Sequence, residues 1–325
     1  MAGMVSSPAA PPELAVDVRD LTVRFDDFVA VDGVSFSVPT GSVLGLLGPN
    51  GAGKTTTVRV LATLLPASGG SASIFGHDVQ HDAHRVRSLV GLTGQYASVD
   101  EELTARENLM VFARLLRFSR AGARRRTAEL LEEFSLTDAA NRSLKHFSGG
   151  MRRRLDLATS LLAEPPLIFL DEPTTGLDPR TRQQMWETIR RLVRGGSTVV
   201  LTTQYLEEAD QLADNIVVID HGKVVAEGSA DELKSSVGSS RLRLSLVDDG
   251  DLPTASQVME QIAGHSVDTE ADRTLVVPVA GASLVTDVLI ALRDKGIEVS
   301  EVGVHKPTLD EVFFQITGNP RKEST

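Results

Sequence analysis

The sequence predicts an α/β protein, in which a core with a parallel sheet, an antiparallel β edge and an inserted block of helices is followed by a small α+β module. Two short apolar runs, residues 167–170 and 198–201, are typical of strands buried on both faces of a parallel sheet. Residues 104–145 are rich in leucine, arginine and glutamate at helical spacing and predict the inserted helices. From residue 239 onward, extended and helical patterns alternate again and indicate the second module.

The other elements follow in chain order. Residues 14–38 alternate apolar and polar side chains and predict two antiparallel strands at the edge of the domain. Residues 42–47 predict a short apolar strand, and residues 55–65 predict a helix that ends before Pro66 and a Ser-Gly-Gly turn. In the second module the predicted strands are 241–247, 274–279 and 297–304, and the predicted helices are 255–263 and 284–295.

Changes in composition predict the domain boundaries. Residues 1–13 are rich in proline and serine and are expected to form a disordered lead-in. The main domain is expected to span residues 14–236, with its helical block at about 96–160. The α+β module then spans residues 239–318, and residues 319–325 form a polar tail.

The composition of the 325-residue chain restricts its partners. With 33 Lys and Arg against 44 Asp and Glu, the formal charge of -11 opposes non-specific attraction to nucleic acid or to anionic lipid. The absence of cysteine excludes disulfides and thiolate metal sites. No apolar stretch reaches the roughly 18 residues that a membrane-spanning helix needs. We expect a chain that stays inside the cell, binds no nucleic acid and does not insert directly into a membrane.

A glycine-rich loop between a predicted strand and a predicted helix matches the pattern GxxxxGK[ST]. Glycines let successive backbone N–H groups and the helix start point at phosphate groups, while the lysine adds charge and the threonine hydroxyl can bind Mg²⁺. The loop predicts a nucleotide site. Its residues are Gly48, Pro49, Asn50, Gly51, Ala52, Gly53, Lys54 and Thr55, with Thr56 beside them.

Two acids end the apolar run 167–170. Asp171 is expected to act on the Mg²⁺ ion, directly or through water, together with Thr55. Glu172 is expected to accept the proton of the attacking water as a general base. The loop and the acids together predict hydrolysis of a nucleoside triphosphate.

A segment that we call the signature segment lies about a hundred residues after the loop and just before the strand that ends in the two acids: Phe147, Ser148, Gly149, Gly150 and Met151. In this order and spacing the chain resembles the ABC ATPases, a branch of the P-loop NTPases. The resemblance covers residues 14–236 and implies ATP as the nucleotide. It also implies a homodimer formed on ATP binding, in which residues 148–151 of one copy close over the γ-phosphate held by the other.

The resemblance assigns further roles to single residues. Gln95 fits the glutamine that senses Mg²⁺ and the attacking water, and Asp178 fits the loop that couples the two sites of the dimer. Phe25 stands where the family usually has a tyrosine stacked on adenine. Each position also has a structural interpretation: Gln95 as a polar loop residue, Asp178 as a helix cap before proline, and Phe25 as a core residue.

Two positions depart from the family pattern. Met151 replaces the usual glutamine of the signature, and Gln204 replaces the histidine expected after the strand 198–201. Gln204 can donate a hydrogen bond to the γ-phosphate but cannot carry a proton or a positive charge. The resemblance therefore implies a catalytic position at Gln204 and slow hydrolysis.

Residues 147–157 and 307–318 resemble the daunorubicin-resistance branch of the family. This resemblance implies export of a hydrophobic drug, antibiotic or lipid through a separately encoded integral membrane permease, with the chain held peripherally at the cytoplasmic face by that permease. An alternative is a soluble ABC-type ATPase that regulates translation or DNA maintenance. Against the alternative, the chain has one phosphate-binding loop and lacks a sustained heptad pattern.

Two kinds of residue cluster are not assigned a site. His77, His81 and His84 lie in a polar stretch without cysteine, which favours a solvated surface over a metal site. The arginine runs 124–126 and 152–154 lie on predicted helices of an acidic chain. Solvated or ion-paired faces are the favoured interpretation of both runs.

Overall fold

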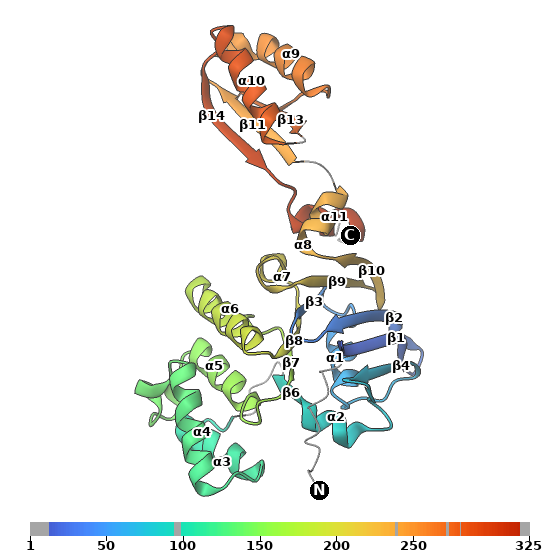
Figure 1. The fold of residues 1–325 in the computed structure, drawn as a ribbon, viewed down its shortest axis with the longest axis vertical. Coiled ribbons are helices and arrows are strands. Elements are labelled where there is room, and N and C mark those ends of the chain that lie inside the picture. The colour runs from blue at the N-terminus through green and yellow to red at the C-terminus, as the bar shows by residue number, and fades with distance from the viewer. Residues whose placement is uncertain (1–12, 94–98, 238–239, 271–272, 280, 319–325) are drawn as a thin grey trace, which may run out of the picture. The chain divides into compact units, whose positions relative to one another are not determined.

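A computed structural model describes residues 13–93, 99–237, 240–270, 273–279 and 281–318. The chain divides into two compact units, Met1–Ala230 and Asp231–Thr325. Figure 1 shows the first unit from blue to yellow and the second from yellow-orange to red. In the part of the chain that is described, no helix is long and apolar enough to cross a membrane.

A six-stranded sheet forms the centre of the first unit, in the order β10-β9-β3-β8-β7-β6. All neighbours pair in parallel except β10, which runs antiparallel to β9. Every residue of β3, β7 and β8 is buried, as the apolar runs predict. The strands are β3 (Val43–Leu47), β6 (Val90–Thr93), β7 (Leu167–Asp171), β8 (Thr198–Thr203), β9 (Asn215–Asp220) and β10 (Lys223–Gly228).

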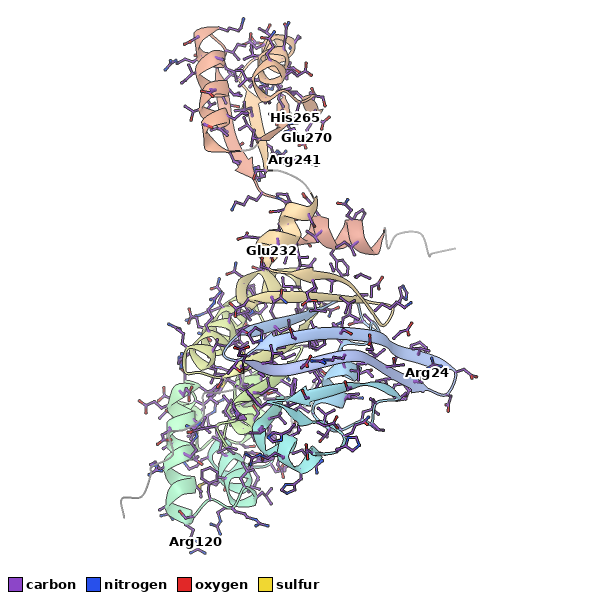
Figure 2. The ribbon with its side chains drawn as sticks, turned by 45° about the vertical axis from the view of Figure 1, so that its right-hand side comes forward. Arg24, Arg120, Glu232, Arg241, His265 and Glu270 are labelled. Atoms are coloured by element: carbon purple, nitrogen blue, oxygen red, sulfur yellow. The ribbon has the colours of Figure 1, made fainter. Side chains whose placement is uncertain are left out.

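The antiparallel strands form a second sheet of their own, in the order β2-β1-β4-β5. β1 and β2 form a hairpin in which Phe25 pairs with Phe28 across a turn at Asp26 and Asp27. Arg24 lies near the tip of this hairpin (Figure 2). The bounds are β1 (Leu14–Phe25), β2 (Phe28–Pro39), β4 (Gly69–Ile74) and β5 (His77–Asp78).

Two hydrophobic cores lie on opposite faces of the six-stranded sheet because side chains alternate along each strand. On β7, Ile168 and Leu170 join the core beneath the helices, whereas Leu167 and Phe169 join the core beneath the antiparallel sheet. The helices of the first core are α3 (Ala105–Leu115), α4 (Arg120–Glu133), α5 (Gly149–Ser160), α6 (Pro179–Arg194) and α7 (Leu206–Leu212), with the short turns η1 (Thr137–Ala139) and η2 (Leu144–His146). The second core holds α1 (Lys54–Leu61) and α2 (Ala83–Leu89).

Helix α1 is shorter than the predicted span 55–65. It ends at Leu61 because Thr63 adopts a left-handed conformation with φ 61°. Leu64 N–H then donates to Arg59 O at 2.8 Å and Thr63 N–H donates to Val60 O at 2.9 Å. This pair of bonds is the Schellman arrangement of a helix end. It stops α1 four residues before the end at residue 65 that Pro66 predicts.

The second unit packs two helices on one face of an antiparallel sheet with the order β12-β13-β11-β14. The chain order β-α-β-β-α-β and this strand order are those of a split βαβ fold. Its core joins strand residues such as Leu244 and Val277 to helix residues such as Met259 and Val288. The elements are α8 (Ala230–Val237), β11 (Ser240–Leu246), η3 (Asp249–Asp251), α9 (Leu252–Ala263), β12 (Asp268–Glu270), β13 (Thr274–Val279), α10 (Ala282–Asp294), β14 (Val299–His305) and α11 (Leu309–Thr317).

Candidate nucleotide-binding site

The glycine-rich loop joins the end of β3 to the start of α1, at the carboxyl edge of the parallel strands. Two of its glycines are required by close approach of other backbone. A Cβ on Gly48, with φ 157°, would lie 2.1 Å from Ile219 O, and a Cβ on Gly53, with φ 106°, would lie 2.5 Å from Ala30 O. The curled loop therefore depends on residues without side chains at these positions.

A pocket of about 440 Å³ lies over this loop. This volume falls within the range of small-molecule and cofactor sites. Asn50 to Thr56 line one part of it, and the antiparallel hairpin and Glu172 line the rest. Gly48 and Pro49 take part through their carbonyl groups, which contact Lys54. The full lining is Phe25, Phe28, Ala30, Asn50, Gly51, Ala52, Gly53, Lys54, Thr55, Thr56 and Glu172.

Lys54 is buried within the loop that it follows. Its ammonium group donates to Gly48 O at 2.7 Å and to Pro49 O at 2.8 Å. Burial lowers the pKa of Lys54, while the nearby carboxylates of Glu172 and Asp171 oppose that change. The loop thus places a positive charge among backbone groups that can face an anion.

Asp171 lies at the end of β7 and contacts two hydroxyl groups. Thr55 Oγ1 donates to Asp171 Oδ1 at 2.9 Å, and Thr202 Oγ1, from the end of β8, donates to the same oxygen at 2.5 Å. A hydroxyl and a carboxylate side by side are oxygen ligands of the kind that Mg²⁺ prefers, with water and phosphate completing its shell. The donor set at this point fits that ion.

Glu172 follows directly and has a left-handed backbone, with φ 49°. This conformation costs a residue with a side chain about 1–2 kcal/mol, so neighbouring groups must hold it. The Glu172 N–H donates to Thr202 O at 3.1 Å and lies 3.1 Å from Thr202 Oγ1. Glu172 Oε2 accepts from Thr175 Oγ1 at 3.1 Å. The turn aims the carboxylate into the pocket beside the loop.

Two aromatic rings border the pocket at the hairpin. Phe25 is 46% exposed and Phe28 is 63% exposed, so the interpretation of Phe25 as a core residue is wrong. Phe28 was not among the predicted site residues. Its signal was the pattern Phe-Asp-Asp-Phe, in which a two-residue turn brings the two rings to opposite strands of one hairpin.

Ser148, Asp178 and Gln204 do not line the pocket of their own chain. Ser148 caps α5 by accepting from Met151 N–H at 3.3 Å, and Ser148 and Gly149 are exposed. Asp178 caps α6 by accepting from Thr181 N–H at 3.0 Å, and hydrogen bonds from Thr181 lower its pKa. Gln204 is exposed just after β8. Gln95 lies outside the described residues.

The signature segment and the first turn of α6 meet through one glycine. A Cβ on Gly150 would lie 2.4 Å from Thr181 Cγ2, so the first turns of α5 and α6 touch at this point. Glycine is required there by close packing and not by a left-handed backbone. The exposed N-termini of α5 and α6 therefore have a fixed local relation to each other.

Comparisons with known proteins show which family has this combination of fold and site. The chain is 50% identical over 311 residues to the daunorubicin resistance ATP-binding protein DrrA3 of Streptomyces coeruleorubidus, covering 95% of this chain and 98% of that protein. It is also 50% identical over 315 residues to the daunorubicin/doxorubicin resistance ATP-binding protein DrrA of Streptomyces peucetius, covering 95% and 94%. The family model of the ABC transporters matches residues 31–175.

The chain belongs to the ABC transporter family of ATP-binding proteins. Like other members of this family it is an ATPase and binds ATP. Its second unit matches the C-terminal domain model of ATP-binding proteins of the DrrA1-3 type over residues 228–317. The expected resemblance to the daunorubicin-resistance branch is thereby confirmed.

Solved structures of ABC ATP-binding subunits confirm the fold. One ATP-binding subunit of an ABC transporter superposes with a TM-score of 0.61 at 31% identity, covering 68% of this chain and 92% of that one. A dimeric ATP-binding cassette bound to ADP and Pi superposes with a TM-score of 0.60 at 25% identity, covering 66% and 98%. The P-loop NTPase core with its helical insertion is thus the observed architecture.

Proposed function

We propose that this ABC ATPase powers export of a hydrophobic drug, antibiotic or lipid through a separately encoded membrane permease. The carrying observation is that Lys54, Thr55 and Glu172 line one pocket, with Asp171 hydrogen-bonded to Thr55 behind it. The relatives named for daunorubicin resistance support the drug class. A further relative is the Nod factor export ATP-binding protein I of Burkholderia orbicola. It is 37% identical over 314 residues, which cover 95% of this chain and 98% of that protein.

In this proposal the nucleotide occupies the pocket with its phosphates on the glycine-rich loop. Lys54 exchanges its carbonyl partners for phosphate oxygens, which are charged and therefore stronger acceptors. Thr55 and Asp171 hold Mg²⁺, and Gln95 completes the set of residues assigned to the ion. When bound there, Mg²⁺ would neutralise charge on the outer phosphates. Glu172 accepts a proton from the attacking water.

Phe25 and Phe28 are proposed to bind adenine by stacking, and both can be tested by substitution. Stacking of a base on an aromatic side chain contributes about 1–3 kcal/mol. We expect Phe25→Ala and Phe28→Ala each to raise the dissociation constant for ATP by roughly 5- to 150-fold, with little change in turnover at saturation. Titration with fluorescent ATP measures the effect. If a variant binds ATP as tightly as the wild type, the replaced ring does not stack on adenine.

A second copy of the chain is proposed to complete the site. Ser148, Gly149, Gly150 and Met151 are at the start of α5, where N–H groups can receive a phosphate. Because the pocket of one chain includes none of them, the γ-phosphate would meet this edge only from the partner copy. Asp178 lies on the neighbouring turn and would couple the two sites. The dimeric relative with bound ADP and Pi supports this arrangement.

Gln204 is expected to act on turnover more than on affinity. Its exposed position after β8, the strand beside Asp171, places it to contact the γ-phosphate by an amide hydrogen bond. We predict that Gln204→His leaves the ATP dissociation constant within a few fold and changes mainly kcat. Paired binding and steady-state hydrolysis assays check this. A large change of affinity at constant turnover would refute the role.

The permease is proposed to dock on the first unit at the cytoplasmic face of the membrane. Helix α3 and the residue after it expose a group of apolar side chains that a partner could cover: Val111 is 47% exposed, Leu115 is 72% exposed and Leu116 is 48% exposed. A peripheral location follows from this docking and not from any membrane insertion by the chain. The identity of the cargo would then depend mostly on the permease.

Inside-out membrane vesicles test the export function directly. Vesicles that contain the chain and its permease are expected to accumulate a fluorescent anthracycline when ATP is added, and not with a non-hydrolysable ATP analogue. The matched control is the Glu172→Gln protein in the same vesicles, which is expected to bind ATP without accumulation. ATP-independent accumulation, or none for any hydrophobic compound tested, would contradict the proposal.

A further inference from the structure

A single side chain binds three consecutive carbonyl groups at the segment that carries Glu172. Arg153 Nη2 donates to Asp171 O at 2.7 Å and to Glu172 O at 3.0 Å. Arg153 Nε donates to Pro173 O at 3.1 Å. The guanidinium thus contacts the peptide groups on both sides of Glu172.

The Arg153 side chain is held firmly in this position. It is 13% exposed, and Nη1 lies 3.6 Å from Oδ2 of Asp156, which is 5% exposed. Burial lowers the pKa of Arg153, and Asp156 is the first of the acids that oppose this change. A planar guanidinium presents its donors in a fixed fork. A buried one with a counter-charge and several acceptors therefore has one favourable geometry.

Arg153 is part of helix α5, which begins after Ser148 at the signature segment. The adjacent arginines of the run 152–154 bind elsewhere in the helical region. Arg152 pairs with Glu101, and Arg154 Nη1 donates to Phe134 O at 3.2 Å. The bonds to the carbonyls of residues 171–173 come from Arg153.

The left-handed turn at Glu172 is therefore held by hydrogen bonds from two elements. Thr202 of β8 binds the Glu172 N–H, and Arg153 of α5 binds the carbonyls of Glu172 and its two neighbours. A shift of α5 along its axis would move the guanidinium and the peptide groups together. The position of the Glu172 carboxylate would change with them.

We propose that Arg153 is a positioning residue that holds Glu172 in its reactive place and links that place to helix α5. This inference rests on the proposed function, since it assigns Glu172 the role of general base. In the proposed dimer, the start of α5 of one chain contacts the phosphate held by the partner copy. A movement of α5 caused by that contact would be transmitted through Arg153 to Glu172 of the chain that carries α5.

The first test replaces Arg153 by lysine, which keeps the charge but loses the fork that spans three carbonyls. Small misplacements of catalytic groups can cost about 10²-fold in rate. We expect Arg153→Lys to lower kcat about 10- to 100-fold, with KM and the ATP dissociation constant within about twofold. Arg154→Lys is the matched control on the same helix and is expected to keep kcat within about twofold. Rates are divided by the concentration of ATP-binding sites found by titration, so that unfolded protein does not lower the apparent kcat.

The second test separates positioning from general stability by a double-mutant cycle. In a Glu172→Gln background there is no general base left to position, so adding Arg153→Lys is expected to cost less than about twofold. If Arg153→Lys does not fold, Arg153→Gln replaces it in both backgrounds. Full kcat in the single variant, or the same fold loss in both backgrounds, would overturn the role of Arg153. If Glu172→Gln alone leaves turnover unchanged, the base assignment in the proposed function falls, and the role of Arg153 falls with it.

Discussion

Replacement of Lys54 by alanine is expected to weaken ATP binding about 100-fold or more. Hydrogen bonds that involve a charged group contribute about 1.5–3 kcal/mol, and the phosphates of ATP offer the buried ammonium group several charged acceptors. In the wild type, the carbonyls of Gly48 and Pro49 hold this group at 2.7 and 2.8 Å, already directed into the loop. Equilibrium titration with fluorescent ATP measures the loss.

Lys295→Ala provides the matched control, since Lys295 is an exposed lysine at the end of α10 in the second unit. It is expected to bind ATP as the wild type does. Thermal unfolding of the Lys54→Ala protein should still show a folded protein, because the removed bonds lie within one loop. Unchanged ATP affinity in folded Lys54→Ala protein would mean that the phosphates bind elsewhere.

Replacement of Glu172 by glutamine is expected to preserve ATP binding while lowering turnover about 10²- to 10⁴-fold. A positioned general base contributes this range, or roughly 3–5 kcal/mol of the barrier. The amide keeps the size of the side chain, and the Thr55–Asp171 contact at 2.9 Å does not involve it. Steady-state phosphate release and ATP titration of the same preparation measure the two quantities.

Glu187→Gln on α6 tests whether the removal of any carboxylate from this unit lowers turnover. Glu187 is exposed on α6 and makes no part of the pocket. Its variant is expected to hydrolyse ATP at the wild-type rate. If Glu172→Gln instead weakens ATP binding and turnover by the same factor, the carboxylate supports binding and is not the base.

Much of the nucleotide site was predictable because its chemistry needs particular residues at fixed local spacing. Gly48 and Gly53 have conformations and contacts that only glycine allows. The spacing of these glycines in the sequence therefore predicts the curled backbone of the loop. The meeting of Thr55 with Asp171 follows from the parallel strands, whose carboxyl ends lie at one edge of the sheet. Both acids were assigned from the end of a buried strand.

The boundaries inside the helical block could not be predicted from the same signals. Helix α3 ends at Leu115 and α4 ends at Glu133, followed by Arg117 with φ 64° and Ser135 with φ 53°. These left-handed positions usually favour glycine or asparagine, which are absent there, so local sequence gave no stop signal. Each helix ends where its backbone folds back on the last turn: Phe118 N–H donates to Ala113 O at 3.0 Å, and Leu136 N–H donates to Leu131 O at 2.7 Å.

Long-range contacts account for the remaining omissions. Arg153 was expected to lie on a solvated or ion-paired face. It is mostly buried and paired with Asp156, but its bonds to the backbone of residues 171–173 were not predicted. Phe28 was passed over because its importance depends on the hairpin that brings it beside Phe25. Such contacts arise from the packing of separate elements, which periodicity does not encode.

Affinity purification of the tagged chain from gently solubilised membranes of its own cells tests the central claim most directly. We expect recovery of one membrane protein with several hydrophobic spans of bilayer length, in amounts comparable to the chain. Lys54→Ala protein is the control for dependence on bound ATP. Recovery from the soluble fraction alone, together with ribosomal or DNA-repair proteins, would leave the ATPase in place and contradict its role in export.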